Sequence, residues 1–313
     1  MLDVRRLSLL REFANRGTVS ATAEALHLTG PAVSQQLAVL EREAGVPLLE
    51  RTGRTLSLTA AGHVLVAHAE VLMGNVAQAE SDLAALRGGT LGTVRIGAFP
   101  SAARAVVSRL WSATPADGVR QAPSLRLVEQ EPELSIAALM RNDVDLAVVH
   151  AYTLLPRDLP ACDATHLLDD QVVLALHPAD AARRGLETGR PARLTEFAES
   201  DWLVPGPETS CHEMIQRACG AAGFVVHPIA HATDFSVLTA LVEAGAGVAL
   251  IPRLALPEGP LEISLHPLTR PVTRTVSALT RAGESRRPEL RHTLDALQEA
   301  AANYLTRARE AGP

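Results

Sequence analysis

The 313-residue sequence contains no lysine, so arginine supplies all 29 of its basic side chains. Cysteine is also scarce: Cys162, Cys211 and Cys219 are too few for the disulfide framework of a small secreted domain. The N-terminus carries no apolar run that could act as a signal peptide. The most apolar stretch, 238–251, contains Glu243 and is too short to cross a bilayer. We therefore expect a cytoplasmic protein that makes no membrane contact.

An excess of positive charge is missing as well, because the formal net charge is −6. Residues 1–62 hold seven arginines and six acidic residues and are net +1, whereas residues 63–87 are net −2 and residues 88–313 net −5. Any contact of the N-terminal end with DNA phosphates must therefore come from individually placed arginines such as Arg51 and Arg54, and not from bulk charge.

Sequence motifs for enzyme chemistry are absent too. The only Gly-x-Gly, at 245–247, lacks a third glycine in register and precedes a predicted strand, which excludes a dinucleotide loop. The eleven histidines lack metal-ligand spacing, and no serine nucleophile elbow occurs. We predict no catalytic residue, no cofactor and no metal.

Two of the cysteines lie on one predicted helix. Cys211 follows the helix N-terminus, where a thiol pKa can fall and redox chemistry becomes possible. Cys219 lies on the same face, but an intact helix separates the two by roughly 12 Å, too far for a disulfide. This spacing favours incidental thiols and leaves a redox switch as the alternative.

The segment "TGPAVSQQLAVLEREAG", residues 29–45, has the features of a capped helix. Thr29 is a suitable N-cap, Pro31 is tolerated in the first turn, and Gly45 ends the helix. One apolar face recurs at helical spacing, at Val33, Leu37 and Leu40. The opposite side of the first turns carries short, uncharged hydrogen-bonding groups, at Ser34, Gln35 and Gln36.

A second short helix precedes this one. Thr18 can cap "TVSATAEALHL", and only His27 and Leu28 separate it from the Thr29 cap. Two short helices with a tight connection make a helix-turn-helix, whose second helix enters the DNA major groove. Gln35 could bond adenine there, and Ser34 a base or a phosphate. The alternative is a plain helical hairpin with its glutamines facing water.

The flanking segments complete a winged helix-turn-helix. A helix over residues 3–16 should pack across the pair, and "RTGRTLSLT" alternates around a glycine as a two-stranded hairpin does. We expect the tip of this wing, Thr52 to Arg54, to contact the minor groove or the DNA backbone. The alternative is a solvated arginine on a turn.

A long helix from Thr59 to about Arg87 follows. Its apolar residues are spaced alternately four and three apart, at Leu65, Ala69, Leu72, Val76, Ala79, Leu83 and Leu86. This 3.5-residue period predicts a coiled-coil seam and hence a dimer, which would read a palindromic site. Packing of the helix within its own chain is the alternative.

Beyond a predicted hinge at 87–92, short apolar runs alternate with helices, which predicts two α/β halves with a cleft between them. We place the crossing segments near residues 150–162 and 263–270. The first half is predicted to comprise about 93–160 and 268–307, and the second about 161–267.

The whole chain resembles the LysR-type transcriptional regulators, most specifically over residues 1–62 and also in "RNDVDLAVV" and "LVEAGAGVALIP". The resemblance implies an α/β fold with an N-terminal all-α winged helix-turn-helix (1–62), a dimerising linker helix (63–87) and a periplasmic-binding-protein-like effector domain of two subdomains (88–313). It also implies a dimer or homotetramer.

The resemblance carries over a set of DNA-binding positions, with departures. Glutamine is common in the family where Gly30 stands, basic residues where Ala38 and Val39 stand, and phenylalanine where Leu49 stands. The predicted DNA-binding residues are Thr29, Gly30, Pro31, Ser34, Gln35, Gln36, Arg51, Thr52 and Arg54.

The predicted effector site lies where strands end and helices begin, since free amides and the positive helix dipole suit an anion there. "GAFPSAA" supplies Phe99, Pro100 and Ser101, and "VPGPETS" supplies Pro205, Thr209 and Ser210. Alternatively, these hydroxyl residues are only N-caps. The resemblance adds further lining residues, namely Gln130, His150, Tyr152, Thr233 and Phe235.

These features predict a regulator that binds double-stranded DNA at a palindromic operator and responds to a small anionic or aromatic acid. RNA polymerase is a further expected partner. Two alternatives remain at this stage: an enzyme with an appended helix-turn-helix, and a small-molecule binding protein whose helical end serves only assembly.

Overall fold

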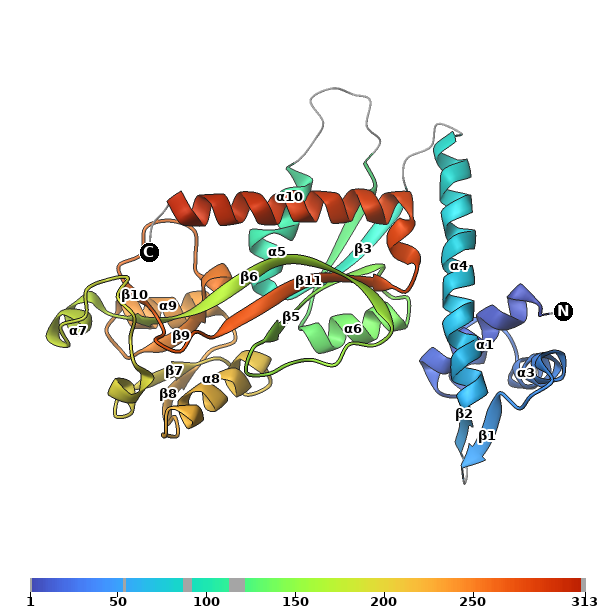
Figure 1. Ribbon diagram of the computed structural model, residues 1–313, viewed down its shortest axis with the longest axis horizontal. Helices are drawn as coiled ribbons and strands as arrows, with labels where there is room; N and C mark the ends of the chain where they lie inside the picture. Colours follow the sequence, from blue (N-terminus) through green and yellow to red (C-terminus); the bar gives the residue numbers. More distant parts are fainter. Residues whose placement is uncertain (1, 53–54, 87–91, 113–121, 311–313) are drawn as a thin grey trace.

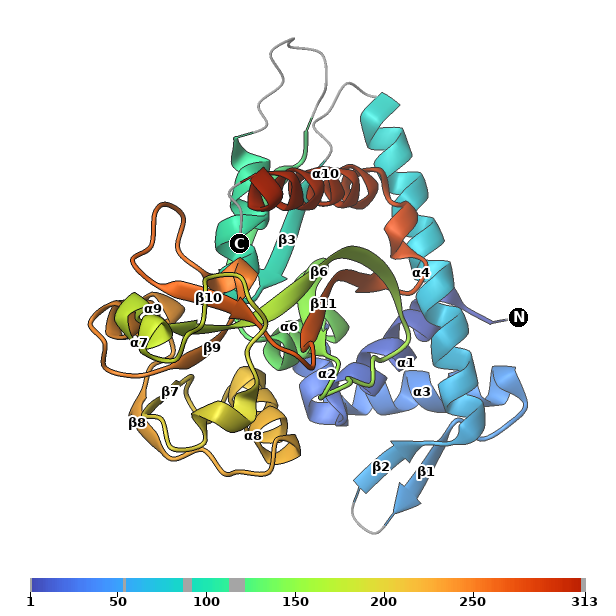
Figure 2. The same ribbon diagram turned by 60° about the vertical axis from the view of Figure 1, so that its left-hand side comes forward.

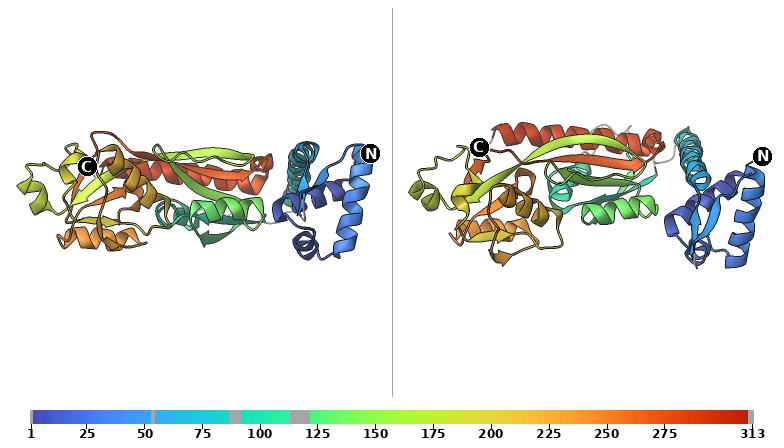
Figure 3. Two further views of the ribbon diagram at one scale, coloured as in Figure 1. Left: turned by 90° about the horizontal axis from the view of Figure 1, so that it is seen from below. Right: turned by 60° about the horizontal axis from the view of Figure 1, so that its bottom comes forward.

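The computed structural model describes residues 2–52, 55–86, 92–112 and 122–310. Three parts follow one another along the chain: a helical N-terminal domain, one long helix, and an α/β domain (Figure 1). The N-terminal domain lies at one end of an elongated molecule (Figure 3). Most of the predicted hinge falls outside the described residues, as does Arg54 at the tip of the wing.

The N-terminal helices begin where the sequence predicts them, because each has a polar cap. The side chains of Asp3, Thr18 and Thr29 accept hydrogen bonds from first-turn amides. Gly45 ends the third helix in a left-handed conformation that other residues rarely adopt. The three helices are α1 (Val4–Arg16), α2 (Val19–Ala25) and α3 (Gly30–Ala44).

The apolar faces of these helices form one core beside a short hairpin. Leu10, Val33 and Leu40 are fully buried in it. The hairpin pairs Leu49 with Leu58 and ends next to the long helix (Figure 2). Its strands are β1 (Leu49–Thr52) and β2 (Thr55–Leu58). The predicted winged helix-turn-helix is therefore present within the described residues.

The long helix α4 (Ala60–Leu86) has two differently packed parts. Leu65 and the fully buried Ala69 pack against the N-terminal core, so this part of the predicted seam is used within the chain. Further along, Leu72, Val76 and Leu83 are 43%, 45% and 54% exposed. Ala79 is exposed as well, while the side chain of Leu86 is outside the described set. Among the described positions of the predicted seam, only those after Ala69 are exposed and thus free to pair with another helix.

The middle of α4 also contacts the α/β domain. It lies beside the turn that leads into the last helix (Figure 1). A Cβ atom added to Gly74 would lie 3.3 Å from the Gly283 backbone. This close approach buries Glu70, and burial raises the pKa of its carboxyl group. Linker and α/β domain therefore meet directly at a point the sequence does not reveal.

The α/β domain is built on a seven-stranded sheet with the path β10-β6-β11-β5-β3-β4, in which β9 also pairs with β6. Strands β3, β4 and β5 run parallel, as predicted, while β11 is antiparallel to β5. The last helix, α10, covers one face of the sheet and α6 the other (Figure 1). These elements are β3 (Thr93–Ala98), α5 (Pro100–Ala105), η1 (Val107–Trp111), β4 (Ser124–Glu129), α6 (Pro132–Met140), β5 (Leu146–Tyr152), β11 (Thr273–Arg281), η4 (Glu284–Arg286) and α10 (Pro288–Glu310).

Strand β6 (Cys162–Leu176) joins the two halves of this domain. Residues 162–171 pair with β11 in the first subdomain, and residues 172–176 pair with β9 and β10 in the second. The predicted crossing near 150–162 is therefore wrong, because one continuous strand crosses later. The short apolar run at 172–176 is only the second part of this strand.

The second subdomain packs helices around a smaller two-stranded parallel sheet, β7-β8. Its core contains the fully buried Trp202. The elements are α7 (Pro178–Arg183), η2 (Leu194–Phe197), β7 (Trp202–Val204), α8 (Ser210–Ala221), β8 (Pro228–His231), α9 (Phe235–Glu243), β9 (Ala249–Pro252), η3 (Arg253–Ala255) and β10 (Ser264–Pro267).

Candidate functional site: a helix-turn-helix face and an inter-subdomain cleft

The first turns of α3 present polar groups on the molecular surface. The Thr29 hydroxyl accepts a hydrogen bond from the Ala32 amide at 3.4 Å, which fixes the start of the helix. Pro31, Ser34 and Gln35 are exposed, whereas the apolar residues of the same helix are buried. Gly30 is partly buried. The exposed side chains of these first turns are uncharged and form no ion pair within the described parts of the chain. They are therefore available for hydrogen bonds to base edges.

Gln36 has a different environment from Gln35. Its Oε1 accepts a hydrogen bond from Nε of Arg6 at 3.0 Å, and the same arginine pairs with Glu43 at 2.6 Å. These contacts tie α3 to α1. Gln36 therefore helps to orient α3, a role that spacing along one helix could not reveal.

The wing also carries a basic side chain on the molecular surface. Arg51 is exposed on β1, where it pairs with Leu56 of β2. The side chain of Thr52 lies outside the described set, and so does the whole of Arg54. Of the predicted wing contacts, only Arg51 is thus placed by the structure.

A cleft of about 340 Å³ separates the two subdomains of the α/β domain. Its walls come from the strand ends and helix starts that the sequence singles out in both halves. All predicted effector residues except Gln130 line it, namely Phe99, Pro100, Ser101, His150, Tyr152, Pro205, Thr209, Ser210, Thr233 and Phe235.

Gln130 turns away from the cleft. Its Nε2 lies 2.9 Å from the position that a Cβ of Gly97 would occupy, next to the Ser135 side chain. The predicted role of Gln130 as a lining residue is therefore wrong. The absence of a side chain at Gly97 leaves the space into which Gln130 folds.

The most buried charge in the cleft was not predicted. Arg274 lies on β11 with its Nε 2.7 Å from Oδ2 of Asp170 on β6, and the two side chains are 2% and 1% exposed. Its Nη2 donates to Ser101 Oγ at 2.8 Å, and the guanidinium lies 5.0 Å from the Phe99 ring centre. The sequence signal was weak, because the strands that contain Asp170 and Arg274 hold several other polar residues.

This arginine is held in its charged form. Burial disfavours the charge, but the adjacent Asp170 carboxylate raises the pKa of Arg274 above its ordinary value. Arg274 thus holds Ser101 and Phe99 in place through its contacts with both, while the Asp170 carboxylate balances its charge. Further lining residues that the sequence reasoning missed are Arg104, Glu129, Glu131, Cys211, Asp234 and Ala255.

Besides the Tyr152 hydroxyl, two buried polar atoms at the cleft have no hydrogen-bond partner among the described residues: Nδ1 of His150 and Oγ of Ser210. Burial, with Arg274 and Arg157 nearby, lowers the pKa of His150 well below its usual value, so the ring is neutral. The ring packs edge-on against the Phe99 ring, with 4.5 Å between the two ring centroids. Unpaired buried polar groups are costly, which makes both atoms candidates for bonds to a ligand.

The cysteines of α8 have the character of core thiols. Cys211 and Cys219 are both free and buried. Burial raises the pKa of Cys211 to about 11 and that of Cys219 to about 12. A thiol with a raised pKa is a poor nucleophile, so a redox role gains no support here.

The described parts of the chain also bear on metal binding and on membrane insertion. No group of three or more His, Cys, Asp or Glu residues there could hold a metal ion. No described helix is both long and apolar enough to span a membrane.

Comparison with protein families gives two matches that together span nearly the whole chain. Residues 4–63 match the family described as "Bacterial regulatory helix-turn-helix protein, lysR family". Residues 87–302 match the "LysR substrate binding domain". The boundary between the matches coincides with the long helix α4.

The chain is also similar, in sequence or in fold, to individual proteins. The chain is similar to the HTH-type transcriptional regulator CbbR of Xanthobacter flavus, at 30% identity over 255 residues, covering 79% of this chain and 72% of the regulator. In fold it is similar to full-length LysG of Corynebacterium glutamicum with bound effector Arg, at a TM-score of 0.61, 19% identity and coverage of 96% and 99%. It is also similar in fold to full-length CbnR in complex with its target DNA, at a TM-score of 0.51, 23% identity and coverage of 96% and 100%.

Proposed function

Because this chain belongs to the LysR family of DNA-binding transcriptional regulators with an effector-binding domain, we propose that it binds a palindromic operator as a homo-oligomer and responds to a small acid in its cleft. The chain is a regulator and not an enzyme, so the enzyme alternative is discarded. The observation that carries the proposal is the exposed polar start of α3, held by a buried apolar face. RNA polymerase is the further partner we propose.

We assign base reading to the exposed side chains of α3 and positioning to their neighbours. Gln35 can form two hydrogen bonds to adenine, and Ser34 can bond a base or a phosphate. Thr29, Gly30 and Pro31 bring the helix start close to the duplex. On the wing we assign backbone or minor-groove contacts to Arg51, Thr52 and Arg54. We assign Gln36 an orienting role through its bond with Arg6.

Replacement of Gln35 with alanine is expected to weaken specific DNA binding by about 1–3 kcal/mol per lost base contact. Binding to random DNA should change little, because phosphate contacts supply it. Gel-shift titrations with genomic fragments upstream of the neighbouring divergent gene, with and without random competitor, measure both quantities.

The matched control is Gln298→Ala, since Gln298 is exposed on α10 of the other domain. It should leave both affinities unchanged. An equal loss on all sequences in the Gln35 variant would assign this residue to the backbone and remove its base-reading role. A wild-type chain with no preference for any fragment would contradict the proposed function itself.

For the effector we propose a small anionic or aromatic acid. Ser210 stands at the N-terminus of α8 with its hydroxyl unpaired among described residues, and helix N-termini favour anions. Phe99, His150 and Phe235 provide aromatic surface in the same cleft. Burial, and then the charge of Glu133, raise the pKa of the lining carboxyl Glu131, which lessens its repulsion of an anion.

Benzoate and a panel of related acids are expected to raise the melting temperature of the full chain, because a ligand that binds only the folded state stabilises it. In Ser210→Ala the stabilisation should be smaller, as the hydroxyl no longer donates to the carboxylate. The exposed Ser236→Ala, which alters another helix start, is the control. If no acid in the panel shifts the wild-type melting temperature, this effector class is wrong.

We further propose that the linker, residues 63–87, forms the first dimer contact through Leu72, Val76, Ala79, Leu83 and Leu86. A tetramer needs a second contact between α/β domains. Exposed apolar side chains that could supply it lie on the edge strand β4 and on α6 in one half, and near β8 in the other, at Leu127, Val128, Leu134, Val225 and Ile229.

A further inference from the structure

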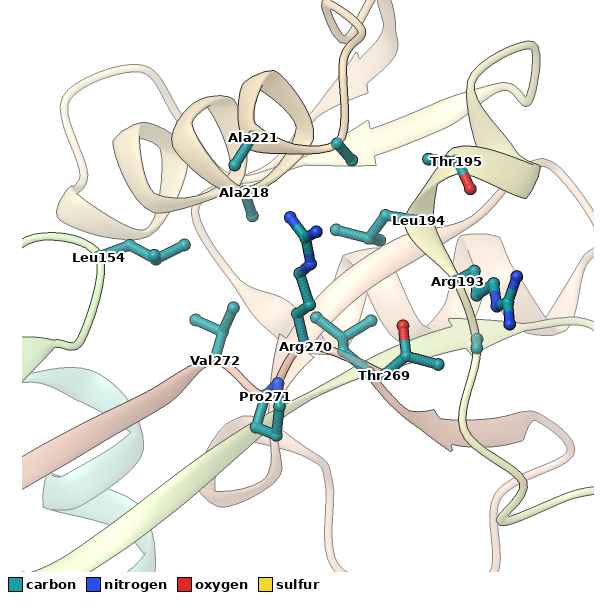
Figure 4. A pocket seen from close by; sticks show the side chains of 13 residues that line it. Leu154, Arg193, Leu194, Thr195, Ala218, Ala221, Thr269, Arg270, Pro271 and Val272 are labelled. Atoms are coloured by element: carbon teal, nitrogen blue, oxygen red, sulfur yellow. The ribbon is translucent and has the colours of Figure 1, made fainter.

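A second cavity, of about 470 Å³, lies in the second subdomain and shares no lining residue with the cleft. One wall is the C-terminal half of α8, at Ala218 and Ala221. The others are the loop after β5, the start of η2, and the segment between β10 and β11 (Figure 4). Its size is within the range of about 300–1,000 Å³ that is usual for small-molecule sites.

The charge of this cavity has one sign. Arg193 and Arg270 line it, and no acidic residue does. The cleft, by contrast, is lined by Glu129, Glu131 and Asp234 as well as by arginines. In a chain of net charge −6, a hollow that carries only positive side chains is a local exception.

Arg270 is placed to meet a ligand. Its side chain extends into the hollow, between Leu194 and the α8 residues Ala218 and Ala221 (Figure 4). It forms no ion pair or side-chain hydrogen bond with any residue that the structure describes. Other arginines of this subdomain do: Arg217 pairs with Glu213.

Apart from Thr195 and Thr269, the remaining residues that line the cavity are apolar. Leu154, Leu194 and Val272 lie around the Arg270 side chain together with the alanines of α8 (Figure 4), and Leu268 also lines the cavity. Such walls favour a hydrocarbon body, while the planar guanidinium favours a carboxylate, which it can bind through two parallel hydrogen bonds. The two requirements together describe an amphipathic carboxylate, such as a medium-chain fatty acid.

The cavity is also connected to the cleft through three segments. The helix α8 lines the cleft at Ser210 and the cavity at Ala221. Leu154 of the cavity lies two residues after Tyr152 of the cleft. Val272 of the cavity lies two residues before Arg274 of the cleft. An occupant of the cavity would therefore contact segments that also contribute to the cleft.

We propose that this cavity is a second ligand site, specific for an amphipathic carboxylate whose head group pairs with Arg270. The site is independent of the proposed effector site, because no side chain belongs to both.

Calorimetric titration of the full-length chain with octanoate tests the site, with octanamide as the neutral analogue of equal length. We expect octanoate to bind saturably. The affinity for octanamide should be lower by at least about tenfold, because charge-assisted hydrogen bonds are stronger than neutral ones. Arg270→Gln should reduce octanoate affinity by about tenfold and leave octanamide affinity unchanged.

Two further variants locate the site. Ala221→Trp fills the hollow from an exposed position and should abolish octanoate binding. Arg190→Gln, in an exposed ion pair with Glu187 outside the lining, should bind octanoate as the wild type does. The cleft variant Phe235→Ala should also bind normally.

Wild-type protein that fails to bind octanoate saturably would overturn the proposal. So would an Arg270→Gln variant with wild-type octanoate affinity, or loss of octanoate binding in Phe235→Ala, which would move the ligand to the cleft. Melting curves of each variant establish that it is folded.

Discussion

Replacement of Asp170 with alanine is expected to lower the free energy of unfolding of the α/β domain by about 3–5 kcal/mol. The carboxylate lies 2.7 Å from Arg274 Nε, and its other oxygen accepts the Leu254 amide at 2.9 Å. Removing it leaves a buried guanidinium without a counter-charge, at a depth where water cannot replace the lost partner. Urea unfolding followed by circular dichroism measures the difference.

The neighbouring residue provides a matched control. Asp169 precedes Asp170 on the same strand but is exposed, where it accepts a hydrogen bond from Thr275 Oγ1. Its replacement with alanine should change stability by no more than about 0.5 kcal/mol. The double variant Asp170→Ala/Arg274→Met, which removes both charges, should recover part of the loss. An Asp170→Ala chain as stable as Asp169→Ala would show that the pair is not a structural requirement.

This pair marks the limit of what spacing along the chain can reveal. Helix starts such as Thr29 and ends such as Gly45 depend on neighbouring residues, so the sequence predicted them correctly. Asp170 and Arg274 are separated by more than a hundred residues and meet only because β6 and β11 are paired. Each residue alone resembles an ordinary polar interruption of a strand.

The same limit explains the two errors in the α/β domain. The residues predicted from strand ends and helix starts, such as Ser101 and Ser210, do line the cleft, whereas His150, Tyr152, Thr233 and Phe235 were suggested by the family resemblance. Gln130 also follows a strand, but the space beside Gly97 lets it turn inward. The crossing was misplaced because β6 mixes polar and apolar residues up to Gln171 and is continuously apolar only from Val172, so its first half does not resemble a strand of the same sheet.

The linker shows how one sequence pattern can serve two kinds of packing. A uniform 3.5-residue period predicted one continuous seam. Ala69 is instead buried against the N-terminal domain, and Gly74 approaches Gly283 on another side of the helix. Only the later apolar positions remain available to a second chain, and the proposed dimer therefore depends on them.

Replacement of Leu72 with glutamate is expected to convert the chain to monomers at micromolar concentration and to weaken operator binding by about 100-fold or more. Leu72 is the first exposed position of the seam, so in a two-fold pairing each glutamate would meet apolar surface and a like charge from its partner. A monomer binds one half-site at a time and loses the effective concentration that joins the two heads. Sedimentation equilibrium and anisotropy titrations measure the two effects.

Ala67→Glu introduces the same charge on the same helix and is the control, since Ala67 is exposed on the side opposite the seam. It should remain oligomeric and bind the operator as the wild type does. Binding to a duplex that contains one half-site is a second test. Both variants should bind this duplex with equal affinity if Leu72 acts only through pairing of the two chains. A Leu72→Glu chain that stays dimeric would rule out this face of α4 as the contact, and loss of half-site binding would point instead to damage in the N-terminal domain that α4 supports.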